Sequence, residues 1–350
     1  MGLHELMERG GHRRLIAVVD RDSGLRAWIA LHHLDRGPAI GGIRIWTYRN
    51  EAEAVADALR LARAMTYKCV LAGVQGGGGK TVVHADALRD RAAAMRRLGE
   101  EIEALGGVYH AGPDVGFGPA DAFEVERATR HLACFGGGHS GLRPAGEATA
   151  EGALWGIRAG LESLGVTDLA GITVAVQGLG AVGCALARRL LEAGARVVAA
   201  DPDPAAAAAG ERLGVELVEP EALPDVPCEV WAPCALGGSL HDLTISRLRT
   251  RVVAALANNA LSRDDQAVQL ARRGILYLPD FVLNAGALIE GEGHARTGRT
   301  DWSRELRRIG DTTRRVLERA ARDGVPPLAA ARTMAEEVLA AEAASRSPVS

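Results

Sequence analysis

The sequence predicts an α/β protein built from two domains, the second of which is a doubly wound parallel sheet. Its 350 residues are enough for two separate hydrophobic cores. From about residue 146 to 290, strand-like segments alternate with helix-like segments, which is typical of a parallel sheet with crossover helices. Between residues 134 and 146 the stretch CFGGGHSGLRPAG is rich in glycine and has few apolar anchors, so it predicts the loop that connects the domains.

The first third of the chain is predicted to mix strands and helices. Asn50 is typical of a helix N-cap, and acids in the following turn favour the positive end of the helix dipole. Apolar positions at helical spacing continue this helix to Met65, and a second helix is expected over 87–105. Extended segments are predicted at 14–19, 25–32, 69–74, 80–84 and 107–110, with the glycine run 76–79 as a loop.

The second domain is predicted to hold six strands, each followed by a helical or turn segment. The tail beyond about residue 305 is alanine-rich and predicted to be helical, ending in a polar stretch. The six strands are expected near 172–177, 196–200, 215–218, 229–232, 252–256 and 275–278.

Composition and charge exclude several classes of protein. Hydrophobic residues make up 47% of the chain and charged residues 24%, as in ordinary globular proteins. A net charge of −3 offers no electrostatic attraction to nucleic acid or to an anionic membrane. The N-terminal segment lacks the apolar core of a secretory signal. The five cysteines form neither a disulfide framework nor a metal-binding cluster. We therefore expect a reduced, cytoplasmic protein without a metal.

The stretch VQGGGGKT at residues 74–81 raises the question of a phosphate-binding loop. That loop requires Gly, four residues and then Gly-Lys-Ser/Thr. Counting back from Gly79, the first glycine should stand at position 74, where the chain has Val74. The spacing fails, so Lys80 must have another role.

A second glycine motif, GLGAVG at Gly178–Gly183, has the context of a dinucleotide-binding fingerprint. A buried strand precedes it, a helix over 184–193 follows it, and Asp201 stands about twenty residues on. Such glycines let the backbone approach a pyrophosphate at a helix N-terminus. Asp201 would accept hydrogen bonds from the ribose hydroxyls, and no neighbouring arginine could neutralise a 2′-phosphate, which favours NAD over NADP. The alternative is a turn whose glycines serve packing alone.

Lys68 and Lys80 are the candidates for binding a substrate and moving protons. Each is expected at the edge of an apolar strand, where burial lowers the pKa of an amine and allows it to act as a base. A lysine kept ionised by an anionic partner would instead bind a carboxylate. The glycines between them would let a substrate lie against the backbone and would aim Lys80. The alternative is that both lysines lie on the solvated surface.

Taken together, these motifs and several further blocks of sequence resemble the Glu/Leu/Phe/Val dehydrogenase family. The resemblance covers roughly residues 10–325, and in length and pattern it is nearest the leucine, valine, phenylalanine and tryptophan dehydrogenases. The blocks that carry it, in the order of the family, are GPAIGGIRIW (37–46), DALRLARAMTYK (57–68), VQGGGGK (74–80), DVG (114–116), VQGLGAVG (176–183), APCALGG (232–238), ANNAL (257–261) and GILYLPDFVLNAG (274–286).

The resemblance implies roles for individual residues. Lys68 would pair with the substrate α-carboxylate near the backbone of Gly41 and Gly42, Lys80 would activate the attacking water, and Asp114 would exchange protons with the substrate nitrogen. The other substrate-binding positions implied are Asn284, Ile40 and Met65. The cofactor-binding positions implied are Gly178, Leu179, Gly180, Ala181, Val182, Gly183, Asp201, Thr149, Ala235 and Asn259.

The activity implied is NAD-dependent, reversible oxidative deamination of an apolar L-amino acid, branched or aromatic, to the 2-oxo acid and ammonia. A substrate-binding and dimerisation domain would span residues 1–140, joined by a C-terminal helix at about 320–345. The NAD-binding domain would span 146–318, with a cleft between the domains. Self-association is expected through the first domain. Two alternatives stay open: a catalytically impaired, NAD-binding relative with a regulatory role, and an imine reductase of a specialised pathway.

Several residues depart from the family pattern. Pro113 and Phe117 flank the DVG block, which makes the setting of Asp114 stiffer and more apolar. Glu147 puts a possible negative charge near the nicotinamide, unless its side chain turns to solvent. Gly76 stands where the leucine enzymes have a bulky apolar residue, so it either opens room for a larger substrate side chain or loosens the loop.

Overall fold

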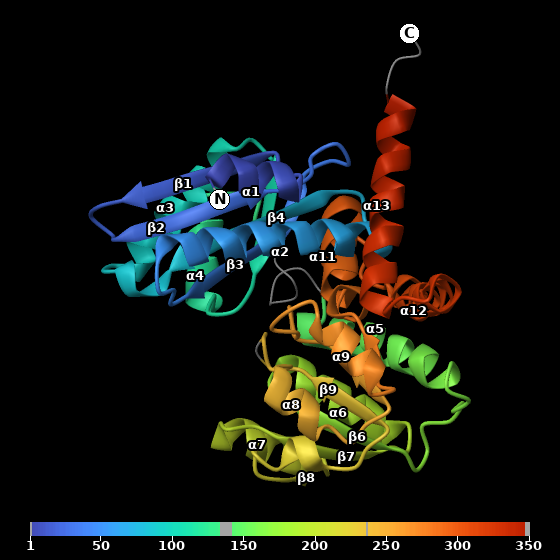
Figure 1. Cartoon of the computed structure of the whole chain (residues 1–350). Coiled ribbons are helices and arrows are strands. Elements are labelled where there is room, and N and C mark those ends of the chain that lie inside the picture. Colours follow the sequence, from blue (N-terminus) through green and yellow to red (C-terminus); the bar gives the residue numbers. More distant parts are fainter. Residues whose placement is uncertain (1, 134–141, 236, 347–350) are drawn as a thin grey trace. The chain divides into compact units, whose positions relative to one another are not determined.

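The computed structural model describes residues 2–133, 142–235 and 237–346. By its internal contacts the chain divides into two compact units, which we call unit 1 (residues 1–135 and 338–350) and unit 2 (residues 136–337). Each unit is built around one sheet covered by helices (Figure 1), so the α/β fold class is confirmed. Most of the predicted connecting loop, residues 134–141, lies outside the described residues, and helix α5 begins at Ala145.

Unit 1 contains a five-stranded mixed sheet with the order β1-β2-β4-β3-β5. Strands β1 (Arg14–Asp20) and β2 (Leu25–Leu31) form an antiparallel hairpin, as predicted, and β2 also pairs antiparallel with β4 (Gly77–His84). Strand β3 (Ala39–Trp46) runs parallel to both β4 and β5 (Tyr109–Pro113). Strand β3 was not among the extended segments predicted from the sequence.

Helices cover both faces of this sheet. Helices α1 (Leu3–Gly10) and α2 (Glu51–Leu71) pack on one face, where Trp28 and Ala30 point. Helices α3 (Arg91–Ala104) and α4 (Pro119–Glu126) pack on the other face, where Ile29 and Leu31 point. Successive side chains of a strand alternate between faces, so burial of both faces explains why β2 is apolar at almost every position.

The prediction of a strand over 69–74 was wrong, because helix α2 continues to Leu71. The helix ends in a Schellman motif, in which the amide of Gly73 donates to Val70 and the amide of Val74 donates to Cys69. An apolar run of six residues fits a buried strand and a buried helix end equally well, and Gly73 was the stop signal that separates the two. Lys68 therefore lies in the last turn of a helix, and not at the edge of a strand.

The prediction of a glycine loop was also wrong, because Gly77, Gly78 and Gly79 belong to strand β4. A β-carbon on Gly78 would lie 2.1 Å from the carbonyl oxygen of Ala62 and 2.2 Å from the amide nitrogen of Thr66, both in helix α2. The glycines thus allow the backbone of α2 to lie directly on β4. The predicted helix over 87–105 is divided into a short 3₁₀ turn, Ala85–Ala87, and helix α3.

Unit 2 contains six parallel strands in the order β11-β10-β9-β6-β7-β8. Numbered from β6, this is the doubly wound order 3-2-1-4-5-6, which reverses direction between β6 and β9. All six predicted strands are confirmed within a few residues. They are β6 (Thr173–Gln177), β7 (Arg196–Ala200), β8 (Glu216–Leu217), β9 (Val230–Pro233), β10 (Val252–Ala254) and β11 (Leu276–Leu278).

The helices of unit 2 surround this sheet (Figure 1), and α5 packs against α6, α11 and α12. Helix α6 begins at Ala181, three residues earlier than predicted and inside the GLGAVG motif. The helices of unit 2 are α5 (Ala145–Glu162), α6 (Ala181–Glu192), α7 (Pro204–Arg212), α8 (Asp242–Arg247), α9 (Gln266–Arg272), α10 (Asp280–Leu283), α11 (Gly286–Thr297) and α12 (Ser303–Asp323). Helix α13 (Pro327–Arg346) begins in unit 2, and its residues from 338 onward belong to unit 1.

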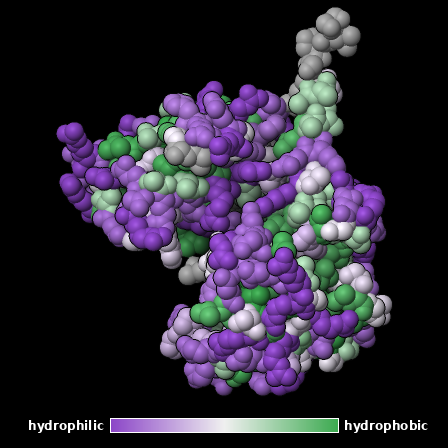
Figure 2. Space-filling model, viewed as in Figure 1, coloured by the Kyte–Doolittle hydropathy of each residue, from purple (hydrophilic) through white to green (hydrophobic). Residues whose placement is uncertain are grey.

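Hydrophilic side chains predominate on the surface seen in Figure 2. The large hydrophobic side chains that are exposed, such as Val19, Phe123 and Leu243, come from separate elements, as is usual for scattered surface residues. Among the described residues, no helix combines the length and the apolar character needed to cross a membrane.

Candidate active site

Three neighbouring strands of unit 1 bring Lys80 and Asp114 together. Lys80 lies on the central strand β4, and Asp114 follows the last residue of β5. The Lys80 Nζ lies 2.5 Å from Asp114 Oδ2, and the two side chains are only 4% and 6% exposed. A β-carbon on Gly42 of β3 would lie 2.8 Å from the Asp114 β-carbon and 3.2 Å from Lys80 Nζ. The backbone of Gly42 therefore borders this ion pair directly.

Burial and charge act on the two partners in different ways. Burial lowers the pKa of the Lys80 amine, and repulsion from Arg44 adds to this effect, although attraction to Asp114 opposes it. Burial alone would raise the pKa of Asp114, but attraction to Lys80 and Arg44 outweighs it, so the pKa of this carboxyl is lowered overall. The arrangement holds an ionised carboxylate beside an amine that gives up its proton more readily than usual.

Sequence reasoning missed Arg44, Asp57 and Tyr48, which surround this pair. Arg44 Nε donates to Asp114 Oδ2 at 3.0 Å, and Arg44 Nη1 donates to Asp57 Oδ2 at 3.1 Å. Tyr48 donates its hydroxyl proton to the same oxygen of Asp57 at 2.8 Å. The available signal was one charged residue, Arg44, inside the otherwise apolar strand AIGGIRIW.

A second missed signal is the scarcity of lysine. Of the 41 lysine and arginine residues only two are lysine, and they are Lys68 and Lys80. Arginine stays charged at any working pH, whereas the ammonium of lysine is a compact charge whose pKa shifts readily on burial. Both lysines are buried, at 7% and 3% exposure. A chain that uses arginine everywhere else keeps lysine at two buried positions.

The other substrate-site positions expected in unit 1 lie on the same elements. Helix α2 packs against β4, so Lys68 and Lys80 come from neighbouring elements. Ile40 is fully buried on β3, and Met65 is half-buried on α2. Gly76 has a φ of 153°, and a β-carbon there would lie 2.4 Å from the Ile40 Cδ1. The methyl end of Ile40 thus occupies the space that a side chain at position 76 would need.

In unit 2 the predicted cofactor residues gather at the carboxyl ends of the parallel strands. Gly178 has a φ of 95°, and a β-carbon there would lie 2.8 Å from the side chain of Ala235, which follows β9. A β-carbon on Gly183 would lie 1.9 Å from the carbonyl oxygen of Gly178, so the third glycine of the motif allows α6 to approach the turn. Asp201 follows β7, and its Oδ2 accepts from the amide of Leu179 at 2.7 Å.

Asn259 and Asn284 lie after β10 and β11, at the same edge of the sheet. Among the non-glycine residues described, only Asn259 has a positive φ, of 52°. The Asn284 Nδ2 donates to Leu256 and to Asn258, but its Oδ1 and the Asn259 Nδ2 are buried without a hydrogen-bond partner in the described structure. Buried polar atoms normally have partners, so this acceptor and this donor are suited to an external ligand. Thr149 is buried on α5 beside the start of α11.

Glu147 neither points freely to solvent nor leaves an unbalanced charge. Its carboxylate pairs with Arg188 at 2.5 Å and with Arg189 at 3.2 Å, both on helix α6. Arg189 also lies 3.5 Å from Glu151, one helical turn further along α5. The departure from the family pattern at position 147 thus belongs to an ion-pair network between α5 and α6.

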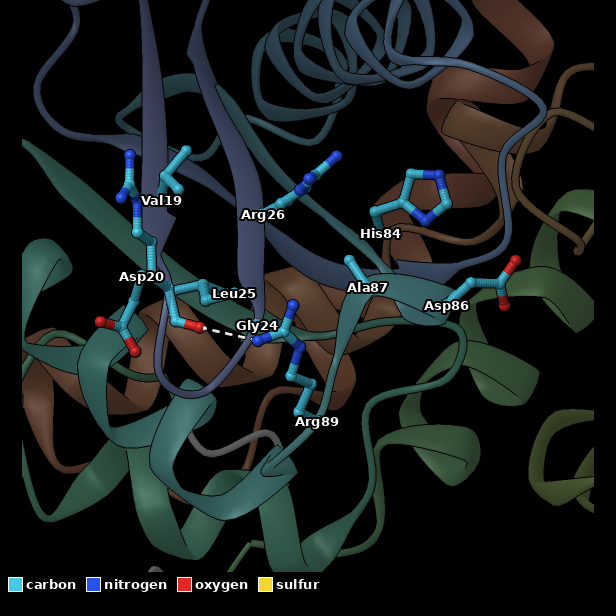
Figure 3. A pocket seen from close by; sticks show the side chains of 10 residues that line it. Val19, Asp20, Gly24, Leu25, Arg26, His84, Asp86, Ala87 and Arg89 are labelled. Carbon is cyan, nitrogen blue, oxygen red and sulfur yellow. Dashed lines mark hydrogen bonds between the residues drawn. The ribbon is translucent and has the colours of Figure 1, made fainter.

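A cavity of about 540 Å³ lies elsewhere in unit 1, between the β1–β2 turn and the end of β4 (Figure 3). Arg21, Arg26, Arg89 and His84 line it, with Asp20 and Asp86. None of the predicted substrate or cofactor residues lines it, so it gives no support to the site expected from the sequence. Within the described residues, no group of three or more His, Cys, Asp or Glu side chains is placed to hold a metal ion.

Unit 2 contains a doubly wound sheet that carries a GxGxxG turn, and unit 1 contains a buried lysine–aspartate pair. With the family match that follows, these features define the protein's class as a dehydrogenase with an NAD(P)-binding domain. The family model "Glu/Leu/Phe/Val dehydrogenase, dimerisation domain" matches residues 12–130, and "Glutamate/Leucine/Phenylalanine/Valine dehydrogenase" matches 137–207 and 205–306. The chain belongs to the Glu/Leu/Phe/Val dehydrogenase family of amino-acid dehydrogenases, which confirms the resemblance.

Individual relatives match along almost the whole chain. The leucine dehydrogenase of Thermoactinomyces intermedius is 39% identical, over 96% of this chain and 93% of its own length. The valine dehydrogenase of Streptomyces albus is also 39% identical, over 98% of this chain and 97% of its own length. The crystal structure of L-tryptophan dehydrogenase from Nostoc punctiforme superposes with a TM-score of 0.81 at 35% identity, covering 97% of this chain and 99% of that one.

Proposed function

We propose that this chain catalyses the NAD-dependent, reversible oxidative deamination of an apolar L-amino acid to the 2-oxo acid and ammonia. The observation that carries the proposal is the buried Lys80–Asp114 pair, whose amine has a lowered pKa, in a chain that belongs to this family. Lys80 is suited to act as a base, because burial lowers the pKa of its amine and favours its uncharged form.

The residues of unit 1 would bind the amino acid and move its protons. Lys68 would hold the α-carboxylate beside the backbone of Gly41 and Gly42. The turn Gly178–Gly183 and Asp201 would hold NAD, which would supply the acceptor for the hydride of Cα. Loss of that hydride would leave the neutral amine of the substrate as an iminium group. Lys80 would then take a proton from the water that attacks this carbon, and Asp114 would exchange protons with the nitrogen as ammonia departs. Both groups are buried, which excludes competing solvent from these transfers.

The residues of unit 2 would hold the dinucleotide. The turn Gly178–Gly183 would approach the pyrophosphate at the start of α6, and Asp201 would accept hydrogen bonds from the adenosine ribose. The Asn259 Nδ2 and Asn284 Oδ1 offer one donor and one acceptor, the pair that a carboxamide such as that of nicotinamide requires. NAD is proposed over NADP because the carboxylate of Asp201 would repel a 2′-phosphate.

An apolar substrate is supported by Ile40 and Met65 and by the leucine, valine and tryptophan dehydrogenases among the relatives. The side chain of Ile40 lies in the space beside Gly76, which argues against the possibility that Gly76 opens room for a larger substrate side chain. Gly76 therefore does not by itself create space for an aromatic substrate side chain. Under this proposal, Ile40 and its neighbours determine whether the enzyme prefers branched or aromatic substrates. We also propose that the chain self-associates through the domain formed by residues 1–140 and a C-terminal helix at about 320–345. The NAD-binding domain would span residues 146–318.

The experiment that tests the proposal is a panel of L-amino acids with NAD, followed by the absorbance of NADH. Apolar amino acids are expected to react, and each 2-oxo acid with ammonia and NADH is expected to react in reverse. A preference for glutamate would contradict the substrate proposal. Binding of NAD without turnover on any amino acid or 2-oxo acid would contradict the activity and favour an impaired relative.

The structural settings of Pro113 and Glu147 support an active enzyme over an impaired one. Pro113 is the last residue of the edge strand β5, opposite Ile43, where a proline is tolerated, and the next residue still reaches Lys80. Glu147 is neutralised by two arginines. Neither departure removes a group that the proposed chemistry needs.

A further inference from the structure

We infer that Arg44 and Asp57 are positioning residues that set the protonation state of the Lys80–Asp114 pair, and that they act on Lys80 in opposite directions. The inference deepens the proposed function and rests on it, because it concerns when Lys80 is able to accept a proton. Neither residue is among the substrate or cofactor positions expected from the sequence.

A continuous chain of contacts connects the two residues to the pair. Asp57 lies on helix α2, Arg44 on strand β3, and their side chains are 11% and 13% exposed. Arg44 bridges the two carboxylates through its Nε to Asp114 and its Nη1 to Asp57. Since Arg44 Nε and Lys80 Nζ both contact Asp114 Oδ2, the two cations share one oxygen atom.

Hydrogen bonds also hold Asp57, the residue of this contact series that lies farthest from the pair. The Asp57 Oδ2 accepts from the Tyr48 hydroxyl at 2.8 Å, and the Asp57 Oδ1 accepts from Arg60 Nη2 at 2.7 Å. On the β5 side, Tyr109 donates its hydroxyl proton to the carbonyl oxygen of Gly41 at 3.0 Å. Among the described residues, the charged and titratable groups that act on the pair from the surrounding elements include Arg44, Tyr48, Asp57 and Tyr109. Arg60 contacts the oxygen of Asp57 that Arg44 does not contact, and the Arg60 side chain is 54% exposed.

The signs of the two effects follow from charge. The guanidinium of Arg44 is permanently positive, so it stabilises the carboxylate of Asp114 and disfavours a proton on Lys80. The carboxylate of Asp57 is negative and favours that proton. In agreement, Arg44 contributes to lowering the pKa of Lys80, while Asp57 acts to raise it. Loss of the Arg44 charge should raise the pKa of Lys80, and loss of the Asp57 charge should lower it.

The test compares Arg44→Gln with Asp57→Asn, which remove one charge each while keeping similar shapes. The readout is the acid limb of kcat/KM against pH for deamination, which reports the base in the free enzyme. Arg44→Gln is expected to move this limb to higher pH and Asp57→Asn to lower pH, each by of order one unit. Arg44→Lys keeps a positive charge and should retain most of the wild-type profile. Arg96→Gln is the matched control, since Arg96 pairs with Glu124 on α4, away from this cluster.

A second measurement needs no substrate. Protein grown with lysine carrying ¹³C at the ε-carbon gives only two side-chain signals, because the chain has only two lysines, and Lys68→Arg identifies the signal of Lys80. The titration midpoint of that signal should shift upward in Arg44→Gln and downward in Asp57→Asn. If Arg44→Gln does not fold, Asp57→Asn still tests the Asp57 part of the inference, because an upward shift or no shift in that variant would refute it.

The outcomes separate the inference from the proposed function. A wild-type enzyme that converts no amino acid would refute the function, and the lysine titration would still be readable. Shifts in the same direction for both variants, or no shift in folded protein, would refute the inference even if the enzyme is active. A merely structural role for Arg44 and Asp57 would lower the rate and the stability without opposite displacements of the midpoint.

Discussion

In unit 1 the polar groups of the candidate site are satisfied within the protein: Lys80, Asp114, Arg44 and Asp57 form a connected set of ion pairs, and no side chain in it is more than 13% exposed. In unit 2 the corresponding edge of the sheet leaves the Asn259 Nδ2 and the Asn284 Oδ1 without partners among the described residues. The comparison shows that the two candidate sites differ in whether their polar groups already have partners within the protein. The groups proposed to move protons are already charge-paired in the structure, whereas the groups proposed to hold the dinucleotide include a donor and an acceptor that a bound ligand would satisfy.

Replacing Lys80 should have the largest effect, because it should lower the rate of catalysis strongly and leave cofactor binding unchanged. Lys80→Ala removes the proposed base, and a loss of roughly 10²–10⁴-fold in kcat is expected from the usual contribution of acid–base catalysis. Lys80→Arg is the matched variant, because it keeps a positive charge beside Asp114 but cannot release its proton. Both variants should bind NADH like wild type in a titration of NADH fluorescence. Full activity in Lys80→Arg would show that the amine is not a base.

Acid should weaken unit 1 through its buried histidines. Burial is the main reason why the pKa of His32 is lowered from 6.5 to about 3, so the folded protein holds a neutral ring that the unfolded chain protonates below pH 6.5. The free energy of unfolding should therefore fall as pH falls from 6.5 towards 3, by roughly 1.4 kcal/mol per pH unit at most for this group.

The measurement is hydrogen exchange of unit 1 peptides between pH 7 and pH 4, corrected for intrinsic rates. His32→Gln cannot titrate, and although it is less stable at pH 7, its stability should depend less on pH over this range. His4→Gln, at an exposed position on helix α1, is the control. An unchanged pH slope in His32→Gln would contradict the assignment of the acid sensitivity to this ring.

Replacing Asp201 should affect unit 2 alone. Asp201→Ala removes the proposed acceptor for the ribose hydroxyls, so the Kd for NAD is expected to rise about tenfold, the equivalent of about 1.4 kcal/mol. The preference for NAD over NADP should fall as well, because the repulsion of a 2′-phosphate is gone. The amino-acid KM at saturating NAD should stay the same. Unaltered discrimination between the two dinucleotides would remove Asp201 from the cofactor site.

Neutralising Glu147 should have the smallest effect. Its charge is balanced by Arg188 and Arg189, so Glu147→Gln is expected to change kcat and the KM for NAD by no more than about twofold, within the range of exposed ion pairs. Steady-state kinetics with NAD as the varied substrate measures this. A tenfold change in either constant would mean that Glu147 acts on the cofactor directly.

The fold of unit 2 could be predicted from the sequence almost completely, and the fold of unit 1 only in part. Each strand of unit 2 is a short apolar run bounded by turn residues, and the GLGAVG motif fixes the first crossover. In unit 1 the predictions for residues 37–80 were partly wrong, because strands β3 and β4 contain glycines, which usually indicate loops. Those glycines are explained only by the helix backbone that lies on them.

The same contrast holds for the sites. The resemblance to the family named both Lys80 and Asp114, the structure brings their side chains into contact, and their roles remain predictions. The Arg44–Asp114 contact joins residues 70 positions apart, across neighbouring strands, and no local pattern specifies such a partner. The pairing of Glu147 with α6 likewise depends on the packing of two helices. Residue types and spacing indicate which groups are chemically capable, but only the packed structure shows which charges offset one another.

The restriction of lysine to two buried positions gives this protein an unusual chemical surface. Reagents that acylate or cross-link amines find no lysine side chain on the exterior, so in the native state they are left with the α-amino group. A lysine-specific protease has only two bonds to cut, one at the end of α2 and one in the middle of the unit 1 sheet. Cleavage of the folded protein would thus report the opening of the site itself.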